Sequence, residues 1–463
     1  MPPTSQSPPL ASILVARFLR SNNYAETLNA FIREAGLPAD AGQVTDSKEN
    51  NWTIESVLEE KKAFDQTLGF ERYGEEEKDE WSVPAPSNPK LIGTPTSSNI
   101  LACSVDPWRH PDSTEDNNPS RLIATGADKQ LHLFQTEADN AIFSSLPGLS
   151  ESPILSYAPI RNGEYVCLTN MSGQLLLQRN AEILDKRKDH AKYAVKVVAF
   201  EDNDSSTWVA TAGWDSKINI YRLDLANKAI GEPVACITLA SNPESLLFVQ
   251  HPDTKELLLL VARRDSTHLY YYQVQRQPPY ECTLRGKQNL APHSNAWIAF
   301  SPSCLALSPH DPGLLAVATS TLPHMKVIIV RLLFPATESL HEGAEPETQA
   351  TQALAALSLQ NREDAAIVIQ ANTFAPQTAY STPQVAWRPD GSGVWVNGDD
   401  GVIRGLEART GKVVTVLKDG HVAGSKIRTI WAGWVDVLRD GEIVREEWLV
   451  SGGFDKRLIV WKA

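Results

Sequence analysis

The residues of this 463-residue chain whose types could carry out chemistry are few and lie far apart. His421 and Asp455 have the types of a general acid–base pair, in which a carboxylate orients an imidazole that moves a proton. The sequence holds no Gly-x-Gly-x-x-Gly or Walker loop for phosphate, no His-Glu-x-x-His for zinc and no Gly-x-Ser-x-Gly for a nucleophilic serine. We therefore predict no cofactor and no metal site. The role of His421 and Asp455 depends on the strands and turns that position them.

Composition and charge narrow the classes of partner. The formal net charge is -13 and the pI is about 5.3, whereas a protein that binds nucleic acid through phosphates needs clustered Lys and Arg. The five cysteines include no Cys-x-x-Cys pair, which favours a reducing compartment. The apolar stretch from Leu10 to Leu19 lacks a charged leader, and the run at 257–262 is too short to cross a bilayer. We expect no direct contact with nucleic acid or membrane, and a location in the cytoplasm, the nucleus or both.

One unit recurs through most of the chain: an apolar run, a polar turn, a second apolar run ending in small residues, a short turn with Asp or Gly, and a third run. Pairs such as Asn162-Gly163 and Asp440-Gly441 fall between the runs, where they favour β-hairpins. The second run starts at seven places: Leu122, Tyr165, Trp208, Leu257, Leu314, Val394 and Trp448. Their intervals are 43, 43, 49, 57, 80 and 54 residues, and we interpret residues 335–364, inside the longest interval, as a surface insertion. Seven such units predict a closed ring.

Residues 420–463 resemble a WD repeat, which opens here with Gly420-His421 and ends with the run from Ser451 through Asp455 to Trp461. The resemblance implies a mainly β fold, a seven-bladed WD-type β-propeller over residues 89–463, closed by a strand near 89–94. In that family a His, a Ser or Thr, an Asp and an aromatic residue form a hydrogen-bonded chain across one blade. Two structural tetrads are thus implied: His421, Ser451, Asp455 and Trp461 in the last unit, and His190, Thr211, Asp215 and Tyr221 in the third. We prefer this structural role for His421 and Asp455, and assign no catalytic residue.

Residues 10–37 carry apolar side chains at helical spacing on both sides of the Ser21-Asn22-Asn23 turn, and Gly36 with Pro38 predicts where the second helix ends. The segment resembles a LisH motif, a small α-helical dimerisation module, with its aromatic and Thr positions filled. The resemblance, together with the excess of apolar residues over one helix face, implies a homodimer formed through Leu14, Phe18, Leu19, Tyr24, Leu28 and Phe31.

Shorter segments surround these two parts. We expect residues 1–9 to be disordered, residues 38–74 to contain a third helix at 53–68, and residues 75–88 to form an acidic, proline-rich linker that is flexible or semi-extended. We also expect the insertion at 335–364 to be a disordered, solvated loop, with a short docking helix carrying Leu354, Leu357 and Leu359 as the alternative.

The position just before the structural Asp points to the mouth of the central channel in WD propellers. At this position or its approximate equivalent stand the candidate partner-binding residues of a rim, namely Met171, Trp214, Arg264, Asp399 and Phe454. Exposed Trp, Phe, Met and Arg are residue types that act as binding hot spots. The alternative is that each side chain simply packs on its neighbouring loop.

The function that fits these features is a non-enzymatic protein-protein interaction scaffold, which dimerises through LisH and binds other proteins or peptides on a propeller face. The alternative is a substrate-receptor or assembly subunit of a ubiquitin ligase complex. The Trp-Asp-x-Arg ending of a cullin-adaptor receptor is missing, since the last blade ends in Trp461-Lys-Ala. An enzyme is a distant third.

Overall fold

The computed structural model describes residues 10–43, 53–58, 81, 83–109, 119–137, 139–293, 300–335, 349–439 and 441–463. The chain divides into two compact units, residues 1–74 and residues 75–463. Within the described ranges, no helix is both long and apolar enough to cross a membrane.

The N-terminal unit contains the predicted pair of helices, α1 (Leu10–Ser21) and α2 (Ala25–Glu34), which pack on each other. Gly36 has a positive φ of 62°, and the amide of Leu37 donates to the carbonyl of Ile32 at 3.0 Å, which closes the end of α2. Of the helix predicted at 53–68, residues 54–58 are helical and residues 59–68 lie outside the described part of the chain. The segments at 1–9 and 75–80 also lie outside it.

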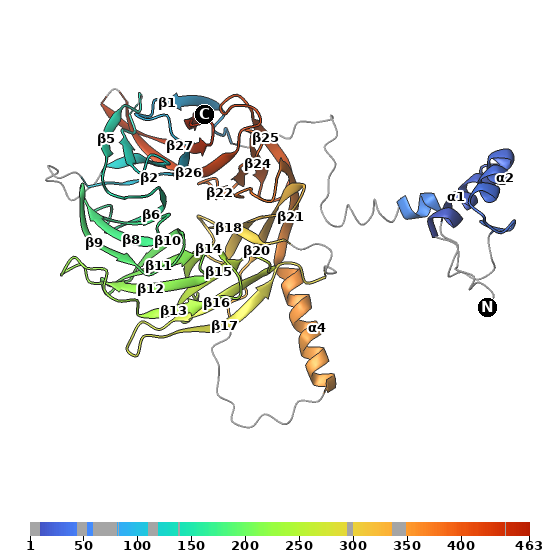
Figure 1. Ribbon diagram of the computed structural model, residues 1–463, viewed down its shortest axis with the longest axis horizontal. Helices are drawn as coiled ribbons and strands as arrows, with labels where there is room; N and C mark the ends of the chain where they lie inside the picture. The colour runs from blue at the N-terminus through green and yellow to red at the C-terminus, as the bar shows by residue number, and fades with distance from the viewer. Residues whose placement is uncertain are drawn as a thin grey trace. The chain divides into compact units, whose positions relative to one another are not determined.

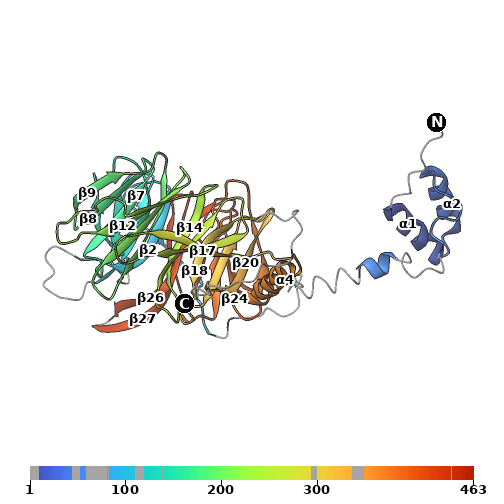
Figure 2. The ribbon, with the colours of Figure 1, turned by 90° about the horizontal axis from the view of Figure 1, so that it is seen from below.

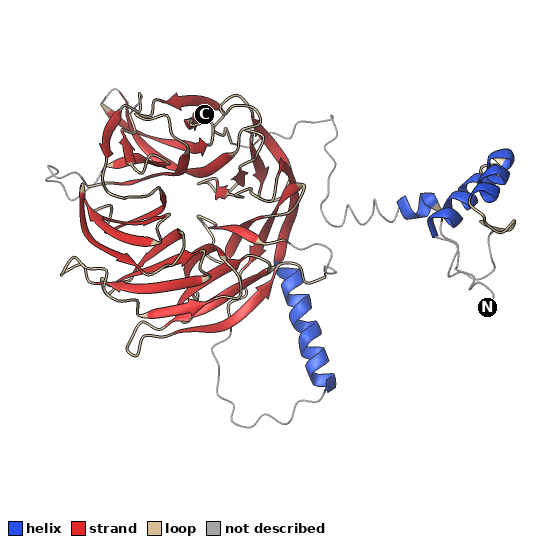
Figure 3. Cartoon of the chain, in the orientation of Figure 1, coloured by secondary structure: helices blue, strands red, loops and turns tan. Residues whose placement is uncertain are grey.

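The larger unit is a β-propeller, in which the described residues form seven four-stranded antiparallel sheets arranged around a ring (Figure 1; Figure 3 shows how strongly strands dominate). The strands of each blade are given from the innermost outward. Blade one contains β2 (Ile100–Pro107), β3 (Ser120–Gly126), β4 (Leu131–Phe134) and β5 (Ile142–Leu146), and blade two contains β6 (Ile154–Ile160), β7 (Tyr165–Asn170), β8 (Gln174–Arg179) and β9 (Glu182–Lys188). Blade three contains β10 (Ala194–Glu201), β11 (Thr207–Gly213), β12 (Lys217–Leu223) and β13 (Ala235–Thr238), and blade four contains β14 (Pro243–Gln250), β15 (Leu257–Arg263), β16 (His268–Val274) and β17 (Cys282–Asn289).

Blades five to seven, in the same order, are β18 (Pro302–Leu307), β19 (Leu314–Thr319), β20 (His324–Arg331), β21 (Ile367–Pro376); β22 (Val385–Trp387), β23 (Gly393–Val396), β24 (Ile403–Glu407), β25 (Val413–Leu417); and β26 (Ile427–Arg439), β27 (Glu442–Gly453), β28 (Leu458–Lys462), β1 (Asn88–Ile92). All seven predicted starting points of the second apolar run lie in second strands, so the seven-bladed fold is confirmed.

The second strands were the visible signal because both of their faces are covered by neighbouring blades. Every residue of β7 and β11 is buried, whereas the outer strand β9 is largely exposed or half-buried. A strand that is covered on both faces needs a continuous apolar run, which is easy to find in a sequence.

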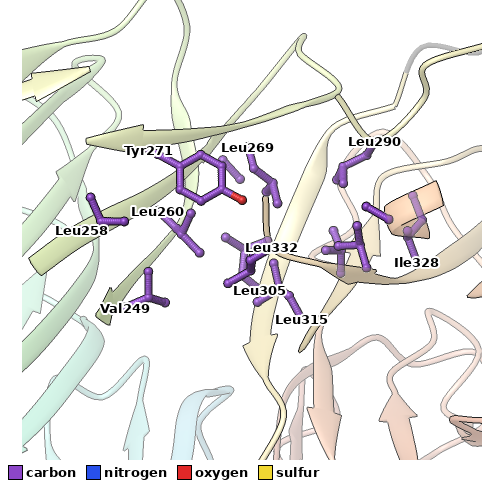
Figure 4. Close-up of a cluster of buried hydrophobic side chains, with 14 of the residues drawn as sticks. Val249, Leu258, Leu260, Leu269, Tyr271, Leu290, Leu305, Leu315, Ile328 and Leu332 are labelled. Atoms are coloured by element: carbon purple, nitrogen blue, oxygen red, sulfur yellow. The ribbon is translucent and has the colours of Figure 1, made fainter. Parts of the chain in front are cut away.

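The hydrophobic core is divided among the gaps between blades. Each of seven clusters of buried described side chains is shared by two neighbouring blades. Figure 4 shows the cluster in which Leu258 and Leu260 of blade four meet Leu305 and Leu315 of blade five. Burying one such leucine contributes roughly 1.5–3 kcal/mol, so the blades stabilise one another around the ring.

The ring closes by pairing the first strand of the propeller with the last. β1 runs antiparallel to β28, from Asn88 opposite Lys462 to Ile92 opposite Leu458. β1 therefore completes the blade that the C-terminal strands leave one strand short, and covers an edge that would otherwise pair with another chain.

Part of the proline-rich segment, which we predicted to be a flexible or semi-extended linker, is described by the structure at residues 81 and 83–88. Arg388, fully buried, forms a bidentate ion pair with Glu447 at 2.7 and 2.9 Å. The same guanidinium donates to the carbonyls of Val83 and Pro84 at 3.4 and 3.1 Å and lies 4.6 Å from the Trp81 ring. Desolvating a charge in this way requires full hydrogen bonding, and the backbone of residues 83–84 supplies part of it. This end of the segment is therefore anchored to the propeller.

The insertion also differs from the prediction, because residues 349–366 form α4 (Gln349–Ala366) and not a disordered loop. Its C-terminal end is held to the propeller, where Glu363 accepts a hydrogen bond from the amide of Asn289 at 2.7 Å. The alternative prediction of a helix carrying exposed leucines matches better, since Leu354, Leu357 and Leu359 are exposed on the helix that projects from the ring in Figure 1. Residues 336–348 lie outside the described part of the chain.

Candidate functional site

The last blade holds its turn with a buried chain of polar side chains. His421 lies on the loop before β26, with Nδ1 3.0 Å from Asp455 Oδ2 and Nε2 2.9 Å from Ser451 Oγ. Trp461 on β28 donates its Nε1 proton to the same Ser451 hydroxyl at 2.9 Å. The side chains of His421 and Asp455 are 1% and 3% exposed, so the imidazole has both nitrogens occupied in a place that solvent barely reaches. This arrangement fixes the turn between β27 and β28.

The Asp455 carboxylate is held in its charged form. Burial opposes ionisation, but hydrogen bonds from His421 and from the amides of Val422 and Arg457 outweigh it and lower the pKa of Asp455 below its ordinary value. The group is therefore ionised and fully bonded at neutral pH.

Blade three repeats the pattern with one change. His190 lies 3.0 Å from Asp215 and 2.8 Å from Thr211. Tyr221, however, donates its hydroxyl proton to Asp189, the residue that precedes the histidine, at 2.9 Å. The donor atom of tyrosine is at the far end of its ring, whereas the donor atom of tryptophan is on the side of the indole. The aromatic residue of this tetrad therefore reaches a different acceptor.

A third acid–imidazole pair lies in blade one, which the sequence reasoning missed. His132 on β4 bonds Asp128 at 2.8 Å through Nε2 and Ser145 at 2.8 Å through Nδ1. Here the histidine lies on the third strand, four residues after the aspartate, and not on the loop before the blade. The spacing of Asp128 and His132 was the available signal.

Four of the five rim residues occupy equivalent places by their backbone geometry, whereas the amide of Asp399 donates to the carbonyl of Pro376 at 3.4 Å. In six blades the amide at the position before the turn residue donates to the carbonyl just before the innermost strand. These bonds run from Ala127 to Asn99, Met171 to Pro153, Trp214 to Tyr193, Arg264 to Asn242, Ser320 to Ser301 and Phe454 to Lys426. Ser320 is the equivalent in blade five, whose turn contains no aspartate. Since these turns lie at the same end of the strands, the positions share one face of the propeller.

The five candidate rim residues differ in how available they are. Trp214 and Phe454 are 42% and 43% exposed. Arg264 is exposed but forms an ion pair with Glu244 at 2.8 Å, and Met171 is half-buried.

Asp399 is engaged within the propeller and not free to bind. Its carboxylate lies 2.9 Å from Lys426 Nζ and accepts a hydrogen bond from Ser381 at 2.5 Å. Trp214 and Phe454 instead present exposed aromatic rings, and the Tyr193 ring lies 5.2 Å from the ring of Trp214.

A cavity of about 410 Å³ occupies the centre of the ring and is lined by residues of all seven innermost strands or the loops that lead into them. Trp214 and Arg264 line it, whereas Met171, Asp399 and Phe454 do not. The channel and one arc of the rim therefore form a continuous surface.

A repeated bulge aims side chains into this cavity. In six blades the innermost strand has a register shift near its start, as between Ala194 and Lys196 in blade three and between Ile427 and Thr429 in blade seven. Bulges of this kind re-aim side chains. Lys196 and Arg428 lie beside these bulges and line the cavity. Each is a charged residue that interrupts a largely apolar stretch near the start of a first strand. That interruption was a signal that the sequence reasoning did not use.

Within the described residues, no group of three or more His, Cys, Asp and Glu side chains is placed to hold a metal ion. The lining of the channel presents aromatic, hydroxyl and cationic groups.

These features define a class of protein, the LisH proteins with a seven-bladed β-propeller. Family models described as "UCP007778, beta-propeller domain" and "UCP007778, LisH domain" match residues 112–462 and residues 11–41. The chain belongs to the UCP007778 family, and the predicted combination of LisH and propeller is confirmed. It is also similar to the "Uncharacterized protein YGR117C" of Saccharomyces cerevisiae, with 23% identity over 360 residues that span 69% of this chain and 74% of the yeast protein.

Proposed function

We propose that the protein is a non-enzymatic scaffold that dimerises through its LisH helices and captures a protein or peptide partner on the propeller face that carries Trp214 and Phe454. The observation that supports this best is the exposure of these two aromatic side chains at equivalent positions on the same face. Large exposed aromatic residues contribute much of the free energy of protein-protein binding. Their amides donate to carbonyls of neighbouring loops, so the backbone that carries the two rings is held in place before a partner arrives.

The argument for a dimer comes from what a single helical pair leaves uncovered. Among the six candidate dimerisation residues, only Leu28 is buried, at 6% exposure. Leu14, Phe18, Leu19 and Phe31 are half-buried, and Tyr24 is 53% exposed. Chains of about 40 residues rarely bury enough apolar surface to fold alone, and a second copy would cover this surface by twofold symmetry.

The dimer is tested with the full chain in which Phe18→Glu and Phe31→Glu are combined. Two charges in an apolar interface oppose association, so light scattering after size exclusion should give the mass of one chain for the variant and of two for the wild type. Asn29→Glu, at an exposed position of α2, is the matched control and should remain a dimer. A monomeric wild type at micromolar concentration would contradict the proposal.

The binding face is tested by affinity purification from the native cells, with the co-purified proteins identified by mass spectrometry. Trp214→Ala and Phe454→Ala should each reduce partner recovery about tenfold or more, with a change in stability below about 0.5 kcal/mol. Trp434→Ala is the matched control, since Trp434 has the same 42% exposure but lies on the β26–β27 hairpin, which projects from the propeller body in Figure 2. Equal recovery by all three variants would dismiss the rim. The identity of the partners would also separate a general scaffold from a ubiquitin ligase subunit.

We also propose a reducing compartment, the cytoplasm or the nucleus. The five cysteines, all in the described part of the chain, are unpaired, and burial raises the pKa of both the Cys103 and Cys167 thiols to about 12. Such thiols are unreactive structural side chains. Fluorescence microscopy of the tagged protein would test the location.

A further inference from the structure

We propose that the central channel is a binding site for an acidic side chain of the partner peptide, with Lys196 and Arg428 as the cations that receive its carboxylate. This inference rests on the proposed function, because it assigns the chemistry of the ligand that the rim holds. It names a site deeper than the rim, formed by the innermost strands themselves.

Lys196 and Arg428 stand out because the part of the chain that the structure describes offers them no counterion. Lys196 on β10 and Arg428 on β26 both line the cavity and are half-buried. Among the described residues, neither side chain has a hydrogen-bond or ion-pair partner. Arg264, the third cation of the lining, is by contrast neutralised by Glu244 at 2.8 Å. The unpaired positive charge is therefore concentrated on Lys196 and Arg428.

The acidic groups of the lining are already in use. Glu244 is bound to Arg264, and Asp106 accepts a hydrogen bond from Ser104, which also lies 2.6 Å from the Tyr157 hydroxyl. Burial raises the pKa of Asp106, which weakens its tendency to carry a charge in the channel. Neither carboxylate thus compensates the two free cations at contact distance.

Leaving Arg428 in this state has a cost. Burial lowers the pKa of its guanidinium, and the more distant Glu244 offsets only part of that effect. Because arginine remains protonated in proteins, the charge stays in a place where water solvates it poorly. An anionic group that binds Arg428 gains a favourable interaction with its charge, because folding has already removed much of the water from the guanidinium.

Neutral groups around the cations suit the same ligand. The hydroxyls of Ser156 and Ser245 line the cavity and accept hydrogen bonds from the amides of Val197 and Leu305, at 3.2 and 3.3 Å. Each hydroxyl proton is then available to point into the cavity, where a carboxylate oxygen would accept it. The channel lining therefore offers two cations and two hydroxyl donors to an acidic ligand.

The size and the surroundings of the cavity favour a peptide over a larger polyanion. A volume of about 410 Å³ accommodates one or two side chains but not a nucleic acid. The net charge of -13 on the whole chain would repel an extended row of phosphates. Trp214 lines the cavity next to the rim, so an apolar residue beside the acidic one would have a surface to contact. The expected ligand is a peptide in which Asp or Glu neighbours a large apolar residue.

The test is selection from a phage-displayed library of random peptides on the full-length protein, followed by titration calorimetry with the enriched sequence. We expect enrichment of Asp or Glu beside an aromatic or aliphatic residue. The same peptide with amides in place of its acids should bind at least about tenfold more weakly, and so should the wild-type peptide to Arg428→Gln or Lys196→Gln. Arg428→Lys should recover binding in part. Lys456→Gln, which removes an exposed charge from the turn of blade seven, should bind as the wild type does.

The outcomes separate this proposal from the proposed function. Enriched peptides that carry no acid but lose binding with Trp214→Ala would overturn the channel site and leave the rim in place. Acidic peptides that bind Arg428→Gln and Lys196→Gln unchanged, in variants that melt as the wild type does, would also overturn it. If no peptide is enriched, the channel proposal is wrong, while capture of a folded partner by the rim is decided by its own experiment.

Discussion

Blade seven and blade five close the same turn with different chemistry. In blade seven a charged Asp455, an imidazole, a hydroxyl and an indole form one buried chain. Blade five has no acid there, and its fully buried Thr319 donates to the carbonyl of Lys326 at 3.0 Å. The turn is further held by Gln377, whose amide donates to the Thr319 carbonyl at 3.2 Å.

The difference between the two turns shows that a blade of this propeller needs hydrogen-bond partners for the polar groups at its turn, and not a particular residue there. Blade six solves the problem a third way, since the buried Asn397 side chain donates to the carbonyls of Thr382 and Ile427 at 2.9 and 2.7 Å. A buried polar group that lacks a partner is costly, and any of these sets of hydrogen bonds avoids that cost. Degenerate repeats can therefore fold into blades of the same shape.

The largest effect is expected at the aromatic end of the blade-seven chain. Trp461→Ala should reduce the free energy of unfolding by about 3–5 kcal/mol, because the ring is 1% exposed and its removal leaves a cavity between blades six and seven. Urea unfolding followed by circular dichroism would measure it. Trp434→Ala removes an equally large but exposed ring and should cost less than about 1 kcal/mol. Equal losses of unfolding free energy in the two variants would mean that burial does not determine the cost of removing these rings.

A smaller effect, with a distinctive dependence on pH, is expected for Asp455→Asn. Loss of the charged acceptor should cost about 1.5–3 kcal/mol at pH 7. Because the pKa of Asp455 in the folded state lies below the unfolded value of about 3.9, the contribution of the carboxylate is fully present above that pH. It is lost as the pH falls through the folded pKa. The difference in stability between wild type and variant should therefore narrow when thermal melting is repeated from about pH 5 to about pH 3. A constant difference would show that the charge of Asp455 adds nothing.

The smallest effect is expected in blade five. Thr319→Val keeps the volume of the side chain and removes one hydroxyl, so it should cost about 1 kcal/mol. Its difference from wild type should not change with pH, since the hydroxyl does not titrate. Measured beside Asp455→Asn under the same conditions, a pH-dependent loss in Thr319→Val would contradict the contrast between the two blades.

The sequence carried enough information for the fold because the second strands are covered on both sides. The run Leu257–Ala262, for example, is fully buried and uniformly apolar. The outer strands carry a weaker signal, as β17 shows with its mostly exposed or half-buried residues. The insertion was misjudged for a related reason, since most of α4 is exposed and its sequence has no apolar stripe to mark it as a helix.

By itself, the sequence determined the two kinds of unit, the seven blades and the polar residues of the last turn, because periodic burial and hydrogen-bond chemistry leave local patterns. Only the tertiary structure decided which distant groups meet. It paired Arg388 with Glu447 beneath Trp81, and it placed Lys196 and Arg428 in one cavity where no described residue acts as their counterion. Whether a charge is paired depends on contacts between residues far apart in the chain, and spacing along the sequence does not record those contacts.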